Sequence, residues 1–135
     1  MLIPRCTYTD PEVASVGATE RELKSGSVAY DVYARDLIEN DRAICEDKSG
    51  LYRVFTKKGT DTILGASLVG GPAGDLIGLV STAMTNKIGL KNLGNAIYPY
   101  PTYAEIFRQM GDAYNKTQYG PKTKMLLRTL LRMRK

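Results

Sequence analysis

The chain has 135 residues, of which 43% are hydrophobic, and this is enough apolar material for one ordinary core, so we expect a single folded domain. No apolar stretch approaches the roughly 18 uninterrupted residues that span a membrane, and the N-terminus lacks the apolar segment of a signal peptide, so we expect a cytoplasmic protein. The net charge of +5 is concentrated in residues 121–135, which carry six basic residues and no acidic one. This distribution excludes a fold-wide phosphate-binding surface, and no nucleic-acid partner is predicted.

The two cysteines, Cys6 and Cys45, have no close partner in the sequence. They match neither a disulfide framework, nor a metal site, nor a CxxC or CxxxxC redox pair. The chain also contains no histidine. We therefore predict two free thiols and no metal site.

The first third of the chain predicts short strands and one helix. Residues 6–9 and 13–16 are strand-like and are separated by an Asp-Pro turn signal. Thr19 then stands three positions before Glu22, which is the spacing of a capping box, and Gly26 marks a stop. A short helix is expected between Thr19 and Gly26.

The middle of the chain predicts a β-meander. Residues 28–34 alternate between apolar and polar side chains, which indicates a strand. Residues 36–50 are polar, and residues 47–50 resemble a hairpin connection. Two β-rich stretches follow, residues 51–56 and residues 62–69.

The last part of the domain predicts two helices and a link between them. Residues 73–88 carry apolar side chains at helical spacing, with Pro72 before the first turn and Gly89 after the last. The prolines in residues 98–101 exclude a helix there, because each one biases its predecessor toward extended geometry. A second long helix is expected over residues 102–116.

Strands that precede helices, without regular βαβ alternation, predict an α+β domain with an antiparallel β-sheet and helices packed on one face. We place this domain at residues 1–118 and a basic amphipathic tail at residues 119–135. Three alternatives stay open for the tail, whose basic and apolar part is residues 122–135. It packs its leucines on its own or a partner subunit, contacts an anionic membrane surface weakly, or is a disordered or nucleic-acid-contacting segment.

Three segments carry a family resemblance. Residues 8–17 read YTDPEVASVG, residues 63–77 begin with ILGASLVG and end with AGDLI, and residues 100–105 read YPTYAE. In this order and spacing they resemble the C-terminal interface domain of the pyridine nucleotide-disulfide oxidoreductases, which include lipoamide dehydrogenase, glutathione reductase and mercuric reductase. The resemblance covers roughly residues 3 to 116.

The resemblance implies a four- to five-stranded antiparallel sheet with helices, a homodimer, and a role in cell redox homeostasis. In complete enzymes of the family this domain follows an FAD domain and an NAD(P) domain, and the whole protein is a flavoprotein oxidoreductase that acts on a sulfur group or a metal ion. Neither of those domains is found in this sequence, which lacks a strand-GxGxxG-helix unit, and residues 70–74 are a poor substitute because Pro72 removes a backbone donor. We therefore expect the chain alone to bind no cofactor and to be inactive.

The family motif HPTxxE aligns with Tyr100, Pro101, Thr102 and Glu105. In the family this histidine lies near the partner subunit's flavin and redox cysteines and acts as acid and base, while the glutamate orients it. The resemblance thus implies Tyr100 and Glu105 as catalytic residues and Tyr100 and Pro101 as flavin contacts. A phenol has a pKa of about 10, against about 6.5 for imidazole, so Tyr100 is expected to be protonated and to donate a hydrogen bond.

Mercuric reductases also carry tyrosine at this position, but their C-terminal pair of vicinal cysteines has no counterpart here. Structural alternatives stand beside these roles. Thr102 and Glu105 have capping-box spacing, so Glu105 is also predicted to cap the second long helix. Tyr100 is alternatively an aromatic that packs at the interface. For the whole chain, the alternative function is a non-catalytic dimerising module that has lost its redox domains.

Overall fold

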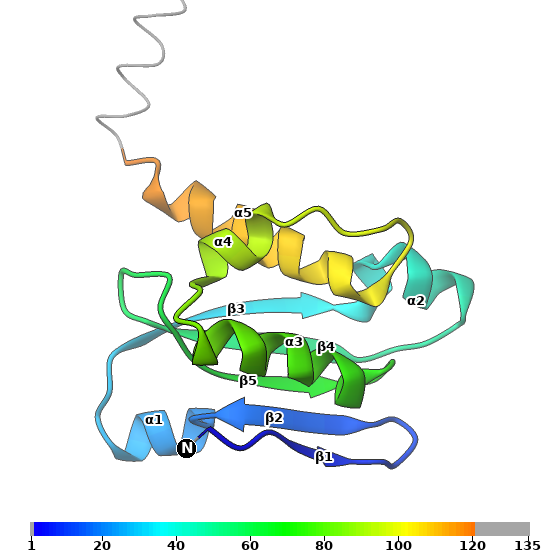
Figure 1. Ribbon diagram of the computed structural model, residues 1–135, viewed down its shortest axis with the longest axis horizontal. Helices are drawn as coiled ribbons and strands as arrows, with labels where there is room; N and C mark the ends of the chain where they lie inside the picture. Colours follow the sequence, from blue (N-terminus) through cyan, green and yellow to red (C-terminus); the bar gives the residue numbers. More distant parts are fainter. Residues whose placement is uncertain (1, 121–135) are drawn as a thin grey trace, which may run out of the picture.

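The fold is built on one antiparallel sheet (Figure 1). The computed structural model describes residues 2–120 of the chain. The sheet has five strands in the order β1-β2-β5-β4-β3, and all neighbouring strands are antiparallel. The strands are β1 (Arg5–Thr7), β2 (Val13–Gly17), β3 (Tyr30–Asp36), β4 (Leu51–Lys57) and β5 (Ile63–Val69). The predicted α+β class and the predicted meander are confirmed, although β3 begins two residues later than residue 28.

The helices are α1 (Glu20–Ser25), α2 (Asp41–Cys45), α3 (Ala73–Thr85), α4 (Leu90–Asn95) and α5 (Ile106–Gln118), with 3₁₀ turns at Leu37–Glu39 and Tyr103–Glu105. Of these helices, α1, α3 and α5 agree with the sequence predictions, whereas α2 and α4 were not predicted. The capping box of α1 is present, and the helical spacing that predicted α3 and α5 is confirmed.

The expected hairpin connection at residues 47–50 is wrong, because β3 and β4 are joined through a 3₁₀ turn and α2. Asn40 starts α2 by accepting a hydrogen bond from the Ala43 N–H at 3.1 Å. The helix α2 is therefore stabilised by its N-cap residue, although its sequence has no apolar stripe. The short helix α4 was likewise not predicted.

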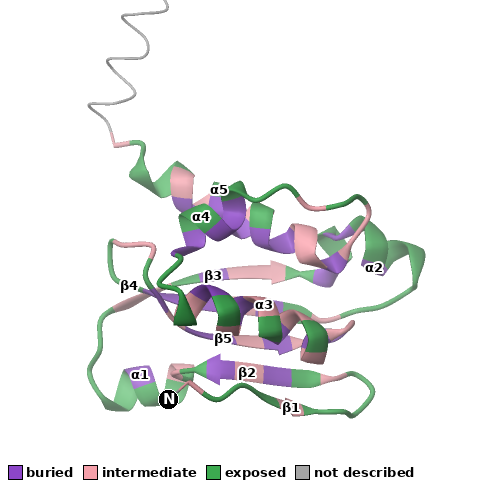
Figure 2. Cartoon of the chain, viewed as in Figure 1, coloured by how far each residue is buried: buried purple, intermediate pink, exposed green. Residues whose placement is uncertain are grey.

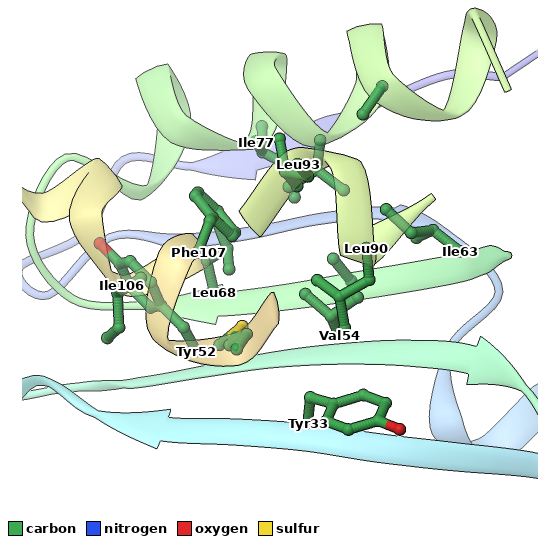
Figure 3. Packing of buried hydrophobic residues seen from close by; sticks show 14 of the residues in the cluster. Tyr33, Tyr52, Val54, Ile63, Leu68, Ile77, Leu90, Leu93, Ile106 and Phe107 are labelled. Carbon is green, nitrogen blue, oxygen red and sulfur yellow. The ribbon is translucent and has the colours of Figure 1, made fainter. Parts of the chain in front are cut away.

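The core lies between the sheet and the helices α3, α4 and α5. Figure 2 shows the buried residues gathered on the sheet and on the inward sides of α3 and α5. In Figure 3, Phe107 of α5 lies beside Leu68 of the sheet, and its ring stacks near Tyr52 with the ring centroids 6.5 Å apart. Apolar burial of this kind is the main force that holds helices on a sheet.

The helices α4 and α5 cross at two glycines. A Cβ atom placed on Gly94 would lie 2.5 Å from the Cα atom of Gly111, so the two backbones approach too closely for any larger side chain. Tyr114, further along α5, makes an edge-to-face contact with Tyr33 of β3. Because both ends of the α4–α5 connection are anchored in this way, the link between the two helices is held at a defined place on the domain.

The basic part of the predicted tail, residues 122–135, lies outside the described residues. Across residues 2–120, no helix combines the length and the apolar character needed to cross a bilayer.

Candidate functional site at the α4–α5 link

The residues of the family motif lie on the link between α4 and α5 and on the 3₁₀ turn that follows it. Residues 96–102 form no helix or strand, which confirms the predicted non-helical link. Most of the link is exposed in Figure 2, and the side chains of Ile97 and Tyr100 are 98% and 70% exposed. The link therefore presents Tyr100 to whatever lies next to this edge of the domain.

Tyr100 is hydrogen-bonded to a residue far away in the sequence. Its hydroxyl donates to the Asp41 Oδ2 at 2.7 Å. The Asp41 carboxylate, by this hydrogen bond and by its charge, raises the pKa of Tyr100 above the ordinary value, and burial, Glu105 and Cys45 act in the same direction. The phenol is therefore held in its neutral, protonated form.

Helix α2 fixes the link through two further hydrogen bonds. Asn40, which is 1% exposed, donates from Nδ2 to the Thr102 carbonyl oxygen at 3.0 Å. At the other end of α2, the Tyr103 hydroxyl donates to the Glu46 Oε2 at 2.7 Å. We call Asn40, Asp41 and Glu46 the α2 clamp, because the three side chains bond to the link and to the 3₁₀ turn that follows it.

The bond between Tyr103 and Glu46 perturbs both groups. Burial and the Glu46 carboxylate raise the pKa of Tyr103 to about 12. The hydrogen bonds from Tyr103 and from Arg42 lower the pKa of Glu46. At neutral pH the bond thus joins a protonated phenol to an ionised carboxylate, which is the stronger kind of hydrogen bond.

Glu105 is paired with Arg108 and not with Tyr100. The Arg108 Nη2 atom donates to the Glu105 Oε1 at 2.7 Å. Tyr100 and Glu105 are close enough for the glutamate's charge to raise the pKa of the phenol. The structure thus brings the two predicted catalytic residues to the same end of the domain without joining them.

The predicted capping box at Thr102 and Glu105 is wrong. Thr102 makes no side-chain capping bond, and its hydroxyl donates instead to the Pro99 carbonyl oxygen at 2.8 Å. Because residues 103–105 form a 3₁₀ turn, the first turn of α5 starts only after Glu105.

The described residues do not fit the phosphates of a dinucleotide. Their sheet is antiparallel throughout, so residues 2–120 contain no βαβ nucleotide-binding unit. At the N-terminus of α3, the Gly74 N–H is already occupied, because it donates to the Glu12 Oε2 at 2.8 Å. A hollow of about 770 Å³ has more acidic than basic groups in its lining, which disfavours a pyrophosphate: four carboxylates (Asp10, Glu12, Glu46 and Asp47) against Arg42 and Lys48. Any flavin contact of these residues is therefore with a cofactor held elsewhere.

Pro101 lies beside Tyr100 and lines a second, shallow apolar hollow of about 260 Å³ together with Leu76. Cys6 and Cys45 are free thiols, the first half-buried and the second exposed. Within residues 2–120, no group of three or more Cys, Asp and Glu side chains is arranged to hold a metal ion.

The α2 clamp is the part of the site that the sequence analysis missed. One signal for it was present: Asn40 followed by Asp41 is the residue pair favoured at a helix N-terminus, where a side-chain cap is followed by an acidic residue. No local pattern, however, indicates that these residues contact the link.

Comparisons with known proteins find matches over most of the chain. The family model described as pyridine nucleotide-disulphide oxidoreductase, dimerisation domain, matches residues 3–111. A mitochondrial dihydrolipoyl dehydrogenase from Caenorhabditis elegans is 35% identical over 108 residues, which are 79% of this chain and 22% of the relative. A leghemoglobin reductase from Glycine max is 33% identical over 131 residues, which are 96% of this chain and 25% of the relative.

Solved structures agree with these relatives. LpdA from Mycobacterium tuberculosis matches with a TM-score of 0.74 and 25% identity, over 86% of this chain and 25% of that one. The flavoprotein disulfide reductase RclA from Escherichia coli matches with a TM-score of 0.76 at 21% identity, over 82% of this chain and 26% of that one, and shows the shared fold. The chain thus spans about a quarter of the length of the proteins it matches.

Proposed function

Because this chain belongs to the dimerisation-domain family of the pyridine nucleotide-disulphide oxidoreductases, we propose that it joins two subunits of an FAD- and NAD(P)-dependent oxidoreductase. Residues 1–118 form the interface domain in this proposal, and residues 119–135 form its tail. The match of the family model to residues 3–111 is the observation that carries the proposal. A cytoplasmic homodimer that serves redox homeostasis is part of the same proposal.

The proposed substrate is a dithiol or its disulfide. Several relatives are named dihydrolipoyl dehydrogenase, and a dihydrolipoyl group is a dithiol. FAD and NAD(P), bound by other domains, supply electron transfer between the dithiol–disulfide couple and the nicotinamide. The relatives are named as dehydrogenases and reductases, which favours this proposal over a non-catalytic dimerising module.

Tyr100 is the residue we propose at the partner subunit's flavin and redox site. It occupies the position of the motif's histidine, and its exposure of 70% leaves the phenol free to contact a neighbouring subunit. Pro101 is proposed to contact the flavin beside it. For Glu105 we propose an electrostatic role, because its charge helps to keep the phenol protonated.

The dimer is tested on the chain itself by sedimentation velocity over a range of protein concentrations. We expect a stable dimer in the absence of flavin. A monomer at all concentrations would overturn the dimerisation proposal.

The role of Tyr100 is tested in the complete flavoprotein with dihydrolipoamide as substrate. Removal of a proton-handling group typically costs 10²–10⁴-fold in rate, so we expect Tyr100→Phe to lower kcat by about 10²-fold. Tyr8→Phe is the matched control, because Tyr8 is 79% exposed on the hairpin between β1 and β2. Equal turnover of the two variants would remove Tyr100 from the mechanism.

A further inference from the structure

We propose that Asp41 is the positioning residue of Tyr100: its carboxylate holds the hydroxyl proton of Tyr100 and presents the phenol oxygen to the reacting thiol as a hydrogen-bond acceptor. The catalytic consequence rests on the proposed function, whereas the hydrogen bond itself is a property of this chain. Asp41 lies outside the family motif and replaces Glu105 as the charged partner of the residue at the histidine position.

The hydrogen bond to Asp41 leaves the Tyr100 hydroxyl able to act only as a hydrogen-bond acceptor toward other groups. A phenol has a single O–H donor, and that donor is occupied by the Asp41 Oδ2 at 2.7 Å. The oxygen of Tyr100 keeps its lone pairs, and the side chain is 70% exposed. An incoming thiol is therefore met by an acceptor. This differs from the donor role that the phenol alone predicts.

Asp41 is held in place independently of Tyr100. The neighbouring Asn40 caps α2 through the Ala43 N–H and donates to the Thr102 carbonyl oxygen. The two backbones that carry the pair are thus tied together one residue from Asp41 and two residues from Tyr100. This arrangement fixes the separation of the two backbones, so that only the two exposed side chains are ordered when the bond forms, at a smaller cost in conformational entropy than for two unconnected segments.

Glu105 is not available for the same task, because its carboxylate is bonded to Arg108. The titratable groups that act on Tyr100 are Asp41 and Cys45 of α2 and Glu105 of the 3₁₀ turn, and all three raise its pKa, Asp41 most. Both carboxylates thus oppose formation of a phenolate. Tyr100 therefore stays neutral at neutral pH.

A relay follows from this arrangement. A proton taken from the thiol goes to the Tyr100 oxygen while the Tyr100 proton goes to Asp41. The products are a thiolate, a neutral phenol and a neutral carboxylic acid, so the phenol is never ionised. The pair Tyr100–Asp41 can therefore take up a proton, which a lone phenol of ordinary pKa does poorly at neutral pH.

The first test needs only this chain. With tyrosine labelled by ¹³C at Cζ, the NMR signal of Tyr100 is identified by its loss in Tyr100→Phe. We expect this signal to titrate above the ordinary value of about 10 in the native chain and to shift to lower pH in Asp41→Asn. Glu105→Gln is the matched carboxylate-to-amide control and should shift the titration less. An unchanged titration in Asp41→Asn, with the circular dichroism of the folded chain retained, would overturn the proposal.

The conservative variant Asp41→Glu keeps a carboxylate one methylene further out, and it should restore part of the raised titration. If Asp41→Asn lost its fold, the comparison of Asp41→Glu with Glu105→Gln would decide the matter. A larger shift of the Tyr100 titration in Asp41→Glu than in Glu105→Gln supports the pair, and an equal or smaller shift contradicts it.

The second test separates this proposal from the proposed function. In the complete flavoprotein, Asp41→Asn should lower kcat for dihydrolipoamide at least tenfold, leave KM nearly unchanged, and move the alkaline limb of the pH profile to lower pH. The double variant with Tyr100→Phe should lose no more than Tyr100→Phe alone, because the two residues act as one unit. If Tyr100→Phe lowers kcat while Asp41→Asn does not, Asp41 has no positioning role. If Tyr100→Phe is fully active but the titration shift is seen, the proposed role of Tyr100 fails and the Asp41–Tyr100 bond stands.

Discussion

Two segments of this chain share the pattern T-x-x-E but fold differently. At residues 19–22 the pattern forms a capping box: the Glu22 N–H donates to the Thr19 hydroxyl oxygen at 3.2 Å, and the Thr19 N–H donates to the Glu22 Oε2 at 2.8 Å. At residues 102–105 the Thr102 hydroxyl donates to Pro99 and the glutamate pairs with Arg108. The same four-residue pattern thus predicts a cap correctly in one place and wrongly in the other.

The difference lies in what competes for the side chains. At Thr19, the hydroxyl and the Glu22 carboxylate bond to each other and to each other's N–H groups, so the local pattern decides the outcome. Around Thr102, the backbone is held by the prolines of the link and by the α2 clamp. The turn that follows is then a 3₁₀ turn, in which the spacing no longer suits a box. Local patterns are therefore reliable where no distant element takes the pairing groups of the pattern itself; β4 contacts Glu20 but leaves Thr19 and Glu22 to each other.

The largest expected effect comes from the residue that ties α2 to the link. Asn40→Ala removes the cap of α2 and leaves the Thr102 carbonyl oxygen without its donor, so we expect a loss of about 2 kcal/mol in the free energy of unfolding. Urea unfolding at one fixed protein concentration measures this. Asn40→Asp is the control, because it keeps the capping oxygen and loses the Nδ2 donor, and it should lie between the native chain and Asn40→Ala. A loss below about 0.5 kcal/mol in Asn40→Ala would show that the clamp does not hold the link.

The next effect tests the segment in which the box is formed. Thr19→Ala removes the capping oxygen of α1, and we expect it to cost about 1 kcal/mol. Thr19→Ser retains a hydroxyl and should cost much less. The same urea titration decides, and equal stability of the alanine and serine variants would contradict a role for the cap.

Most of the fold was predictable from the sequence, because a helix or strand with a long apolar pattern can be recognised from one continuous segment. The buried stripe Ile106, Phe107 and Met110 of α5 follows helical spacing, and Ile77 and Val80 do the same for α3. The antiparallel meander was predicted from one alternating segment, residues 28–34, and from two β-rich stretches, residues 51–56 and 62–69. Short polar elements have no such stripe, which is why no helix was predicted within the polar residues 36–50, where α2 lies.

The candidate site was predictable only in part. The family motif placed Tyr100, Pro101 and Glu105 close together, on the link and on the 3₁₀ turn that follows it, because motif residues are adjacent in the sequence. The bonds that organise the site join Tyr100 to Asp41, 59 positions away, and Thr102 to Asn40, 62 positions away. Pairs at such separations leave no trace in spacing or periodicity, so only the folded chain reveals them.

The third effect is a dependence of stability on pH that comes from the hydrogen bond between Tyr103 and Glu46 of the α2 clamp. Tyr103 has a pKa of about 12 in the folded chain, against about 10 when it is unfolded, so its contribution is complete below about pH 10 and is lost as the pH rises toward 12. We expect Tyr103→Phe to lose less stability than Thr19→Ala at neutral pH, because Glu46 keeps Arg42 as a partner.

The measurement is the difference in unfolding free energy between the native chain and Tyr103→Phe, followed from neutral pH to about pH 12. Other tyrosines with raised pKa values, such as Tyr98 and Tyr114, are present in both proteins and cancel in the difference. The difference should shrink above about pH 10. A difference that stays constant over this range would mean that Tyr103 does not bond to Glu46 in solution.

The smallest effect is expected where the pattern T-x-x-E fails to form a box. Thr102→Ala removes only the bond from a partly exposed hydroxyl to the Pro99 carbonyl oxygen, which water can replace, so we expect a loss of no more than about 0.5 kcal/mol. The alanine variants at Thr19 and Thr102 make the same chemical change in the same four-residue pattern, and each serves as the control for the other. If Thr102→Ala cost as much as Thr19→Ala in the urea titration, the hydroxyl would be capping a helix in solution. The contrast between the two segments would then be lost. There would also be no reason to conclude that α2, and not the pattern T-x-x-E at residues 102–105, holds the link in place.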